Sequence, residues 1–208
     1  MSVERLKEAL LDGDQNRAVL EAKLVRDAGV PSETIVTEAI EKAMEQLGAK
    51  CTVEQFNLLE IMLVGRAVTA VMKWLFPEGA PPAAVKGAAV LASLEGDVHD
   101  LGKNIVKTVL IAKGIGVIDC GKDCSLHKLI ETAEREKAQF ICISGLITSI
   151  VPQVRRVREL CMSRGLQRIR IVAGGAALKQ STAENLNVDY VAENAFDGAR
   201  YIAEILEA

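Results

Sequence analysis

Residues 87–114 read GAAVLASLEGDVHDLGKNIVKTVLIAKG: a short apolar run, a polar loop and an amphipathic stretch. The run at 87–93 has the length of a buried strand, and the apolar residues of 102–114 recur at helical spacing. Four further apolar runs, each followed by a stretch with helical character, lie at 116–121, 139–144, 168–175 and 188–194. This alternation predicts an α/β fold: a flavodoxin-like or Rossmann-like, doubly wound, five-stranded parallel sheet with helices on both faces.

The N-terminal part of the chain follows a different pattern. Apolar residues recur at helical spacing from Val3 to about Phe76, which indicates about four helices, and Ser32 is a candidate N-cap after Pro31. Residues 76–84, FPEGAPPAA, then prevent a helix from continuing, because proline lacks the amide donor that a helix needs. We expect an N-terminal four-helix cap domain at residues 1–80 and an α/β domain at residues 81–208.

Composition excludes several classes of protein. The 208 residues are 50% hydrophobic, enough for the chain to bury a core of its own. The 25 Lys and Arg against 28 Asp and Glu leave a net charge of −3, with no basic stripe for a nucleic-acid backbone. The N-terminus lacks the apolar core of a signal peptide, and no run approaches the roughly 20 apolar residues of a membrane span. We expect a cytoplasmic protein that binds neither nucleic acid nor membrane.

The cysteines are odd in number and scattered, which favours reduced thiols over a disulfide framework. Two of them are separated by three residues, but no second such pair accompanies them, so a zinc site is only weakly indicated. The five are Cys51, Cys120, Cys124, Cys142 and Cys161.

Three loops of the predicted sheet carry unusual residues. Ligands of such sheets bind beyond the carboxyl ends of the strands, and in the common strand order 2-1-3-4-5 the loops after strands one and three flank the binding point. The first loop, LEGDVHDLG, contains Asp97 and His99, and the loop after strand three, SGLITS, carries hydroxyl groups. In the loop after strand four, Gly174 and Gly175 lack side chains, so another molecule can approach the backbone. The three loops together predict a polar binding site beside a slot.

Each feature also has a simpler explanation when it is taken singly. Asp97 or Asp100 can cap the helix that begins near Leu101, His99 can be a solvated loop residue, and Gly102 can serve the turn. The glycine pair at 174–175 can form a tight strand-to-helix connection. The other histidine of the chain lies on a charged helical face and is assigned no function. The coincidence of the three features at neighbouring loops favours a ligand site.

The residues of these loops resemble the cobalamin-binding signature shared by methionine synthase, the B12-dependent mutases and the corrinoid proteins of methyltransferase systems. A helical bundle, a proline-rich linker and one α/β domain also resemble the small corrinoid proteins that serve methylamine, methanol or aryl methyl ether methyltransferases. The resemblance covers essentially the whole chain. The cofactor-binding residues that it implies are Asp97, Val98, His99, Asp100, Leu101, Gly102, Ser144, Leu146, Thr148, Gly174 and Gly175.

The resemblance implies a cobalamin or related corrinoid bound with its own lower base displaced, the base-off, His-on state. His99 would then coordinate cobalt, and Asp97 would bind the other ring nitrogen and fix the tautomer. In such proteins Co(I) gives up its axial base and methyl-Co(III) keeps it, so Asp97 and His99 would carry the chemistry. Ser144, Gly174 and Gly175 would line the slot for the nucleotide tail, and Gly102 would let the first helix begin close to it.

The function that the resemblance implies is a methyl-carrier subunit of one-carbon metabolism. A substrate-specific methyltransferase would place a methyl group on Co(I), a second, acceptor methyltransferase would remove it, and a reductive activator is a further partner. The subunit would not be catalytic alone. The alternatives are a cobalamin-responsive regulator, although residues 1–80 show no basic recognition helix, a mutase small subunit, and a flavodoxin-like domain without corrinoid.

The sequence departs from the family at two places. Methionine synthase has a serine, and many methyl carriers a threonine, at the position of Ile150, so the third member of the proton relay is absent there, with Thr148 or Ser149 as substitutes. Relatives also have a Phe-Leu-Pro element that shields the upper face of the corrin, where this chain has residues 57–59, Asn-Leu-Leu. Phe56, Leu59 and Met62 are the candidate shielding residues.

Overall fold

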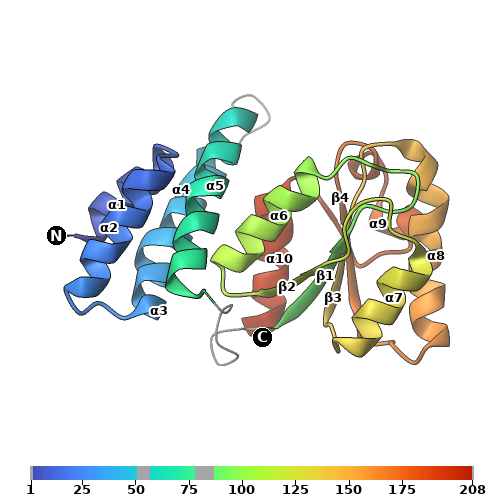
Figure 1. Ribbon diagram of the computed structural model, residues 1–208. Coiled ribbons are helices and arrows are strands. Elements are labelled where there is room, and N and C mark those ends of the chain that lie inside the picture. The colour runs from blue at the N-terminus through green and yellow to red at the C-terminus, as the bar shows by residue number, and fades with distance from the viewer. Residues whose placement is uncertain (1, 51–56, 78–86, 208) are drawn as a thin grey trace. The chain divides into compact units, whose positions relative to one another are not determined.

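The computed structural model of the protein describes residues 2–50, 57–77 and 87–207 (Figure 1). The described residues divide into two compact units. One contains residues up to 77 together with 108–114, and the other contains residues 87–107 and 115–207. The expected domain boundary between residues 80 and 81 lies outside the described residues.

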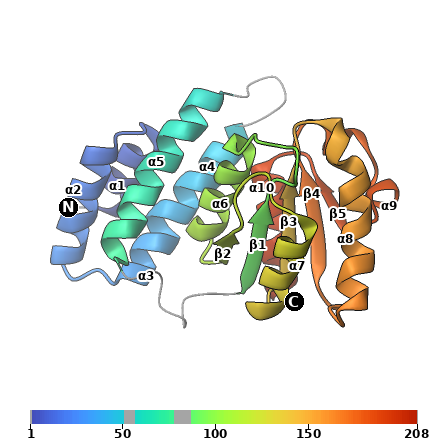
Figure 2. The same ribbon diagram turned by 45° about the vertical axis from the view of Figure 1, so that its right-hand side comes forward.

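The helical pattern of the N-terminal part of the chain is confirmed (Figure 2). The elements are α1 (Val3–Leu11), α2 (Gln15–Asp27), α3 (Ser32–Ile35), a π-helical turn (Val36–Glu41), α4 (Lys42–Lys50) and α5 (Leu58–Leu75). Asp14 and Asn57 cap α2 and α5 through their side chains. Ser32 is the first helical residue rather than a cap, because the Pro31 carbonyl already accepts a bond from the Ile35 amide. The core of this unit includes Leu6, Leu10, Ile35, Ile40, Leu47, Val64, Val68 and Val71.

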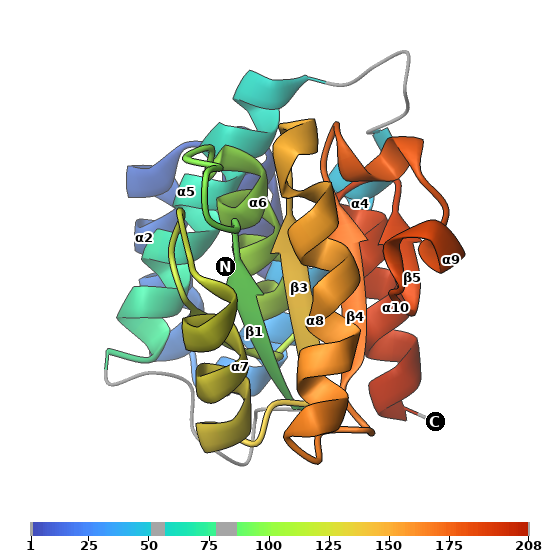
Figure 3. The ribbon, with the colours of Figure 1, turned by 90° about the vertical axis from the view of Figure 1, so that its right-hand side faces the viewer.

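Five strands of the described chain form one parallel sheet in the order β2-β1-β3-β4-β5 (Figure 3). The predicted strand order is therefore confirmed. The strands are β1 (Ala88–Ala92), β2 (Gly116–Asp119), β3 (Phe140–Ser144), β4 (Arg170–Gly174) and β5 (Tyr190–Ala192). The order reverses at β1, because its neighbours β2 and β3 are the next two strands along the chain. The carboxyl ends of β1 and β3 therefore flank the point at which ligands of such sheets bind.

Helices cover both faces of the sheet. Figure 3 shows α7 (Leu126–Arg135) and α8 (Val151–Ser163) in front of the strands, with α6 (Leu101–Ala112) and α10 (Ala195–Glu207) behind them. The short α9 (Ala183–Leu186) precedes β5. Alternate strand residues face the α7–α8 layer, as the period of two in a strand requires. The cluster there includes Val90, Ala92, Ile141, Ile143, Ile171, Ala173, Leu129, Val154 and Val157.

No helix within the described ranges combines the length and the apolar character needed to cross a bilayer. The cysteines in those ranges, namely Cys120, Cys124, Cys142 and Cys161, are free and buried, and Cys51 lies outside them.

Candidate functional site

The centre of the site is the carboxylate of Asp97, in the loop between β1 and α6. Its side chain is 0% exposed. Oδ1 accepts a hydrogen bond of 3.0 Å from the His99 amide and one of 2.8 Å from the His99 ring nitrogen Nδ1. Oδ2 accepts a 2.7 Å bond from the Leu146 amide, in the loop after β3. The predicted Asp97–His99 pair is therefore present, and it joins two loops of the sheet.

The hydrogen bonds decide the charge of Asp97. Burial alone would raise the pKa of this carboxyl. Donation from the Leu146 amide, and then from the amide and ring of His99, outweighs burial and leaves the pKa of Asp97 below its usual value. The carboxylate is therefore ionised at neutral pH and can only accept hydrogen bonds. It follows that Nδ1 of His99 carries the proton in this pair.

His99 is oriented so that its second ring nitrogen is available. The His99 side chain is 51% exposed although its partner is fully buried. Among the described residues, no hydrogen bond reaches Nε2. With the proton on Nδ1, Nε2 of the neutral ring has a free lone pair, which is the form that binds a metal. The Ser93 hydroxyl fixes the His99 backbone from below, donating a 2.9 Å bond to its carbonyl.

The surroundings of His99 are apolar and open. Val98 is 57% exposed and Leu146 is 50% exposed, so the two loops that hold the Asp97–His99 pair each present a large aliphatic residue to solvent. Gly102, in the first turn of α6, lies close to Ser144, since a Cβ added at residue 102 would come within 3.1 Å of the Ser144 hydroxyl. Asp100 precedes α6 and accepts the Asn104 amide through its carbonyl. Leu101 begins α6, but its side chain is outside the described structure.

The glycine pair after β4 lies against the loop after β3. The Gly145 amide donates a 2.9 Å bond to the Gly174 carbonyl. Gly175 has a φ of +98°, and a Cβ there would come within 2.4 Å of the Gly145 carbonyl oxygen. The close approach at Gly175 is thus one between two backbones of the protein. A Cβ added at Gly174 would meet only ordinary contacts with Ala192, so a side chain there is excluded by neither backbone geometry nor packing.

Ile150, the residue at the relay position, belongs to the core. Its side chain is 0% exposed and lies in the cluster between the sheet and α7–α8. Thr148 and Ser149 are exposed in the 3-10 turn at Thr148–Ile150, and no hydrogen bond within the described residues links either side chain to Asp97. The third hydrogen bond of Asp97 comes instead from a backbone amide, that of Leu146.

Sequence reasoning missed the loop after β2. Asp123 in this loop accepts a 2.7 Å bond from the Gly96 amide, and its own amide donates to the Asp97 carbonyl at 3.1 Å. Lys103, 3% exposed, pairs with Asp119 at 2.6 Å at the base of the same loop. A signal was present in the sequence, since the second predicted run, 116–121, ends at Gly121 and Asp123 follows two residues later. The predicted site included only the loops after strands one, three and four.

The donor set fits a metal that brings most of its own ligands. No group of three or more His, Cys, Asp or Glu residues that could enclose an ion gathers in the described chain. One imidazole nitrogen, held by a buried carboxylate and flanked by exposed Val98 and Leu146, suits the lower face of a planar macrocycle with a central metal. A corrinoid is such a group, and the residues present fit it.

Comparisons with known proteins match both parts of the chain. Residues 87–207 match a family described as B12 binding domain, and residues 2–75 match a second family of the same description. Dimethylamine corrinoid protein 3 of Methanosarcina acetivorans is 36% identical over 191 residues, with 90% of this chain and 89% of that protein covered. Dimethylamine corrinoid protein 2 of Methanosarcina mazei is 30% identical over 207 residues, with 98% and 96% covered.

Solved structures share the fold. The methanol:cobalamin methyltransferase complex of Methanosarcina barkeri contains a chain that matches with a TM-score of 0.83 and 24% identity, over 99% of this chain and 80% of that one. The monomethylamine corrinoid protein of the same organism matches with a TM-score of 0.55 and 27% identity, over 96% of each chain. By the match of its residues 87–207 and by its identity to the dimethylamine corrinoid proteins, the chain belongs to the B12-binding-domain family.

Proposed function

We propose that the protein is the methyl-carrier subunit of a corrinoid-dependent methyltransferase system, and that it binds its corrinoid in the base-off, His-on state. The observation that carries this proposal is the pair formed by the buried Asp97 carboxylate and the half-exposed His99 ring. Because Asp97 binds Nδ1 and holds the ring in one orientation, Nε2 is left to bind a metal. When bound, the corrinoid supplies a cobalt centre that accepts and gives up a methyl group.

The chain's own contribution is to hold the ligand and its proton. Asp97 fixes the tautomer and the orientation of the His99 ring through its contact with Nδ1. The pair would be the part of the chain that holds a proton whenever Nε2 is not bound to a metal. Asp97 is 0% exposed and receives a backbone amide on its other oxygen, so its position does not depend on solvent.

The nucleotide tail of the corrinoid would enter beside α6. Gly102 brings no side chain of its own to this approach, and the Ser144 hydroxyl lies 3.1 Å from the place that a Cβ would take at residue 102. Gly174 supports the same slot because its surroundings have room for a methyl group. Gly175 has a reason of its own in its left-handed backbone and its contact with Gly145, so the slot rests on Gly174 more than on Gly175.

The partners would be two methyltransferases, one specific for the methyl donor and one for the acceptor, with a reductive activator as a third. The names of the relatives support this, since they are dimethylamine corrinoid proteins, and a structural neighbour is part of a methanol:cobalamin methyltransferase complex. They favour a methylated amine as the donor and favour a carrier over a regulator. Leu59 and Met62, exposed on α5, are candidates to shield the methyl group, and Phe56 lies outside the described residues.

The decisive experiment compares the two histidines of the chain. Wild-type protein reconstituted with hydroxocobalamin is expected to bind one corrinoid and to show the absorbance spectrum of an imidazole-ligated, base-off cobalamin. His99→Ala should give the spectrum of base-off cobalamin with water as the lower ligand. His127→Ala is the matched control, because this exposed histidine pairs with Glu131 at 3.5 Å on the surface of α7, and it should behave as wild type. An unchanged spectrum for His99→Ala would refute the assignment of the cobalt ligand.

A further inference from the structure

The loop after β2, residues 121–125, runs beside the loop that carries Asp97 and His99. The Ser93 amide donates to the Gly121 carbonyl at 3.1 Å, and the Cys124 amide donates to the Ser93 carbonyl at 2.9 Å. The Glu95 amide then donates to the Cys124 carbonyl at 2.9 Å. This ladder extends the parallel pairing of β1 and β2 beyond the ends of both strands. The β2 loop is therefore a fixed neighbour of the signature loop.

The base of the β2 loop is itself anchored. Asp119, the last residue of β2, accepts a 2.9 Å bond from the Gly121 amide and pairs with the buried ammonium of Lys103 at 2.6 Å. Burial raises the pKa of Asp119, but the bonds from Lys103 and Gly121 outweigh it and hold that pKa below its usual value. An ionised carboxylate with a buried cation in contact resists displacement. These contacts therefore hold the first residues of the β2 loop in place.

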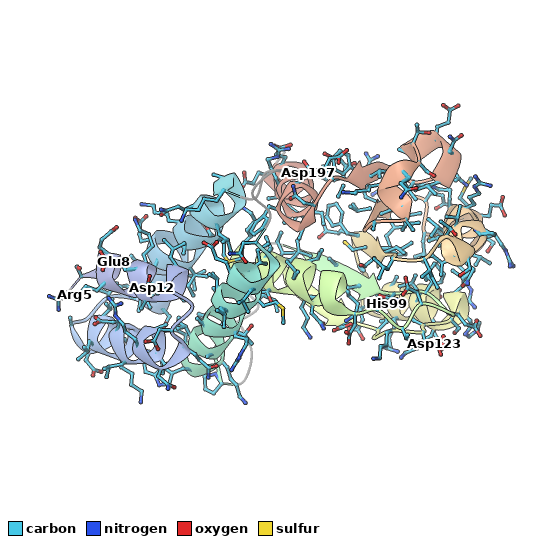
Figure 4. All side chains as sticks on the ribbon, turned by 90° about the horizontal axis from the view of Figure 1, so that it is seen from above. Arg5, Glu8, Asp12, His99, Asp123 and Asp197 are labelled. Atoms are coloured by element: carbon cyan, nitrogen blue, oxygen red, sulfur yellow. The ribbon has the colours of Figure 1, made fainter. Side chains whose placement is uncertain are left out.

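Asp123 makes the contacts nearest to the site. Its Oδ1 accepts the Gly96 amide at 2.7 Å, and its amide donates to the Asp97 carbonyl at 3.1 Å. The residue has a φ of +53°, a conformation that Asp and Asn tolerate better than most residues. Its two bonds hold Gly96 and Asp97 from one side of the chain. Figure 4 shows Asp123 and His99 at the same end of the α/β unit.

The bonds of Asp123 bear on the His99 ring through Asp97. The Asp97 amide donates to the Leu94 carbonyl at 2.9 Å, and the Asp97 carbonyl receives the Asp123 amide. The carboxylate that orients the ring projects from this backbone. A shift of the Gly96–Asp97 segment would therefore move Oδ1 relative to both the amide and the Nδ1 of His99. Because hydrogen bonds weaken steeply with distance and angle, a small shift would loosen the ring.

We propose that Asp123 is a positioning residue for the cobalt ligand: it holds the Gly96–Asp97 backbone so that Asp97 keeps the His99 ring in the orientation that binds the metal. The inference rests on the proposed function, in that His99 is taken to be the lower ligand of a corrinoid. The hydrogen bonds of Asp123 go to Gly96 and Asp97 and not to the ring, so it acts through Asp97. Because Asp123 is exposed, its role is in placement more than in global stability.

Two substitutions at Asp123 distinguish the contribution of its carboxylate from that of its backbone amide. Asp123→Gly keeps the left-handed conformation and the amide donor but removes the acceptor for Gly96. Asp123→Asn keeps both the conformation and an oxygen acceptor, so it is the conservative rescue. Asn187→Gly is the matched control, because Asn187 also has a positive φ, +56°, and its side chain also bonds a backbone group, the Arg155 carbonyl.

Two readouts are needed. The first is the electron paramagnetic resonance spectrum of the reconstituted protein with Co(II), in which nitrogen splitting reports axial imidazole. The second is the amide hydrogen-exchange rate of Gly96 in isotope-labelled apoprotein, which involves no cofactor. Loss of one net hydrogen bond corresponds to about a threefold to tenfold change in an equilibrium. Asp123→Gly should therefore raise the ratio of water-ligated to His99-ligated protein, and the exchange rate of Gly96, by about that factor.

Asp123→Asn and Asn187→Gly should both stay close to wild type in the two readouts, and thermal unfolding of the apoprotein should change little in Asp123→Gly. If wild-type protein lacks the nitrogen splitting, the ligand assignment in the proposed function is wrong, and the role of Asp123 falls with it. If wild type shows the splitting and Asp123→Gly matches it, the role of Asp123 alone is refuted. An equal loss of His99 ligation in Asn187→Gly would refute it as well.

Discussion

Two largely buried carboxylates, Asp97 and Asp189, lie at opposite edges of the sheet and make similar hydrogen bonds to the backbone but pair with different side chains. Asp97 follows β1 at the carboxyl edge, and Asp189 precedes β5 at the amino edge. Each accepts a 2.7 Å bond from a backbone amide of a neighbouring segment, Leu146 in one case and Ile171 in the other. Burial would raise the pKa of each, and in each the hydrogen bonds outweigh burial and lower the pKa.

The remaining partners differ. Asp189 also pairs with Arg158 and with Arg170. These guanidinium groups carry only donors and have no lone pair that could bind a metal. Asp97 pairs with a histidine, which uses one ring nitrogen for the carboxylate and keeps the other. In the first arrangement every partner of the carboxylate is a donor without a lone pair, whereas the second leaves one free ring nitrogen at the carboxyl edge of the sheet. The nature of the partner, and not the burial of the carboxylate, decides whether the cluster leaves a nitrogen lone pair that could bind a metal.

The largest effect on stability is expected from a substitution that removes Asp189 from its cluster at the amino edge of the sheet. Asp189→Ala leaves the Ile171 amide and the partly buried Arg158 without their acceptor, and this should cost about 3 kcal/mol of unfolding free energy. The measurement is urea unfolding of the apoprotein, with exposed Glu159→Ala on the same helix as Arg158 as the control. The spectrum of bound corrinoid should not change. A changed spectrum at full folding would mean that the two edges are coupled.

Asp97→Asn should have a smaller effect on stability and a larger one on the ligand. An amide side chain has one oxygen, but three donors surround this position: the amides of Leu146 and His99 and the Nδ1 proton of His99. One or two donors lose their acceptor, at a cost of about 1 to 2 kcal/mol. Where the NH2 group faces Nδ1, it forces the proton onto Nε2, which then cannot bind a metal; where the oxygen faces Nδ1, the bond to the ring loses the charge of the carboxylate and weakens. Unfolding and absorbance spectra of the same samples test both effects, and an unshifted spectrum would contradict the tautomer argument.

The glycines after β4 sharpen the contrast within the carboxyl edge. Gly174→Ala adds a methyl group that meets only ordinary contacts, so the apoprotein should keep its stability while corrinoid affinity falls by about 1 kcal/mol, or roughly fivefold. Gly175→Ala should instead lower apoprotein stability. Residue 175 has a φ of +98°, and the added Cβ would lie only 2.4 Å from the Gly145 carbonyl oxygen. Corrinoid titration and thermal unfolding distinguish the two variants. Equal destabilisation by both would assign the pair to the turn.

The smallest effect is the response of the apoprotein to acid. A carboxyl whose pKa is lowered by folding stabilises the protein above its unfolded pKa of about 4, and that contribution is lost as the pH falls through the lowered value. Asp97, Asp119 and Asp189 all belong to this class. Stability should therefore be level near neutrality and decline below about pH 4. Urea unfolding at several pH values measures it, and a stability that rises on acidification would contradict the sign.

Much of the fold was readable because it depends on local patterns. Alternating strand and helix patterns indicated the α/β class, and the helical spacing between Val3 and Phe76 predicted the helical unit. Ile150 shows where such reasoning stops. The resemblance indicates that Ile150 stands where relatives have the hydroxyl of a proton relay. In the structure Ile150 lies in the core, and the Leu146 amide donates to Asp97 instead. A backbone donor has no side-chain signature, so no motif could have indicated it.

The sequence by itself placed Asp97 and His99 two residues apart in one predicted loop, and the resemblance to the cobalamin-binding signature supplied their pairing. It also indicated a doubly wound parallel sheet, for which the order 2-1-3-4-5 found in the structure is a common one. Only the tertiary structure decided what holds that pair in place. Leu146 is 49 residues from Asp97 along the chain, and Asp123 is 27 residues from Gly96. Contacts of that range depend on where the loops end in space, and this is set by packing of the whole sheet and not by any local preference of the residues involved.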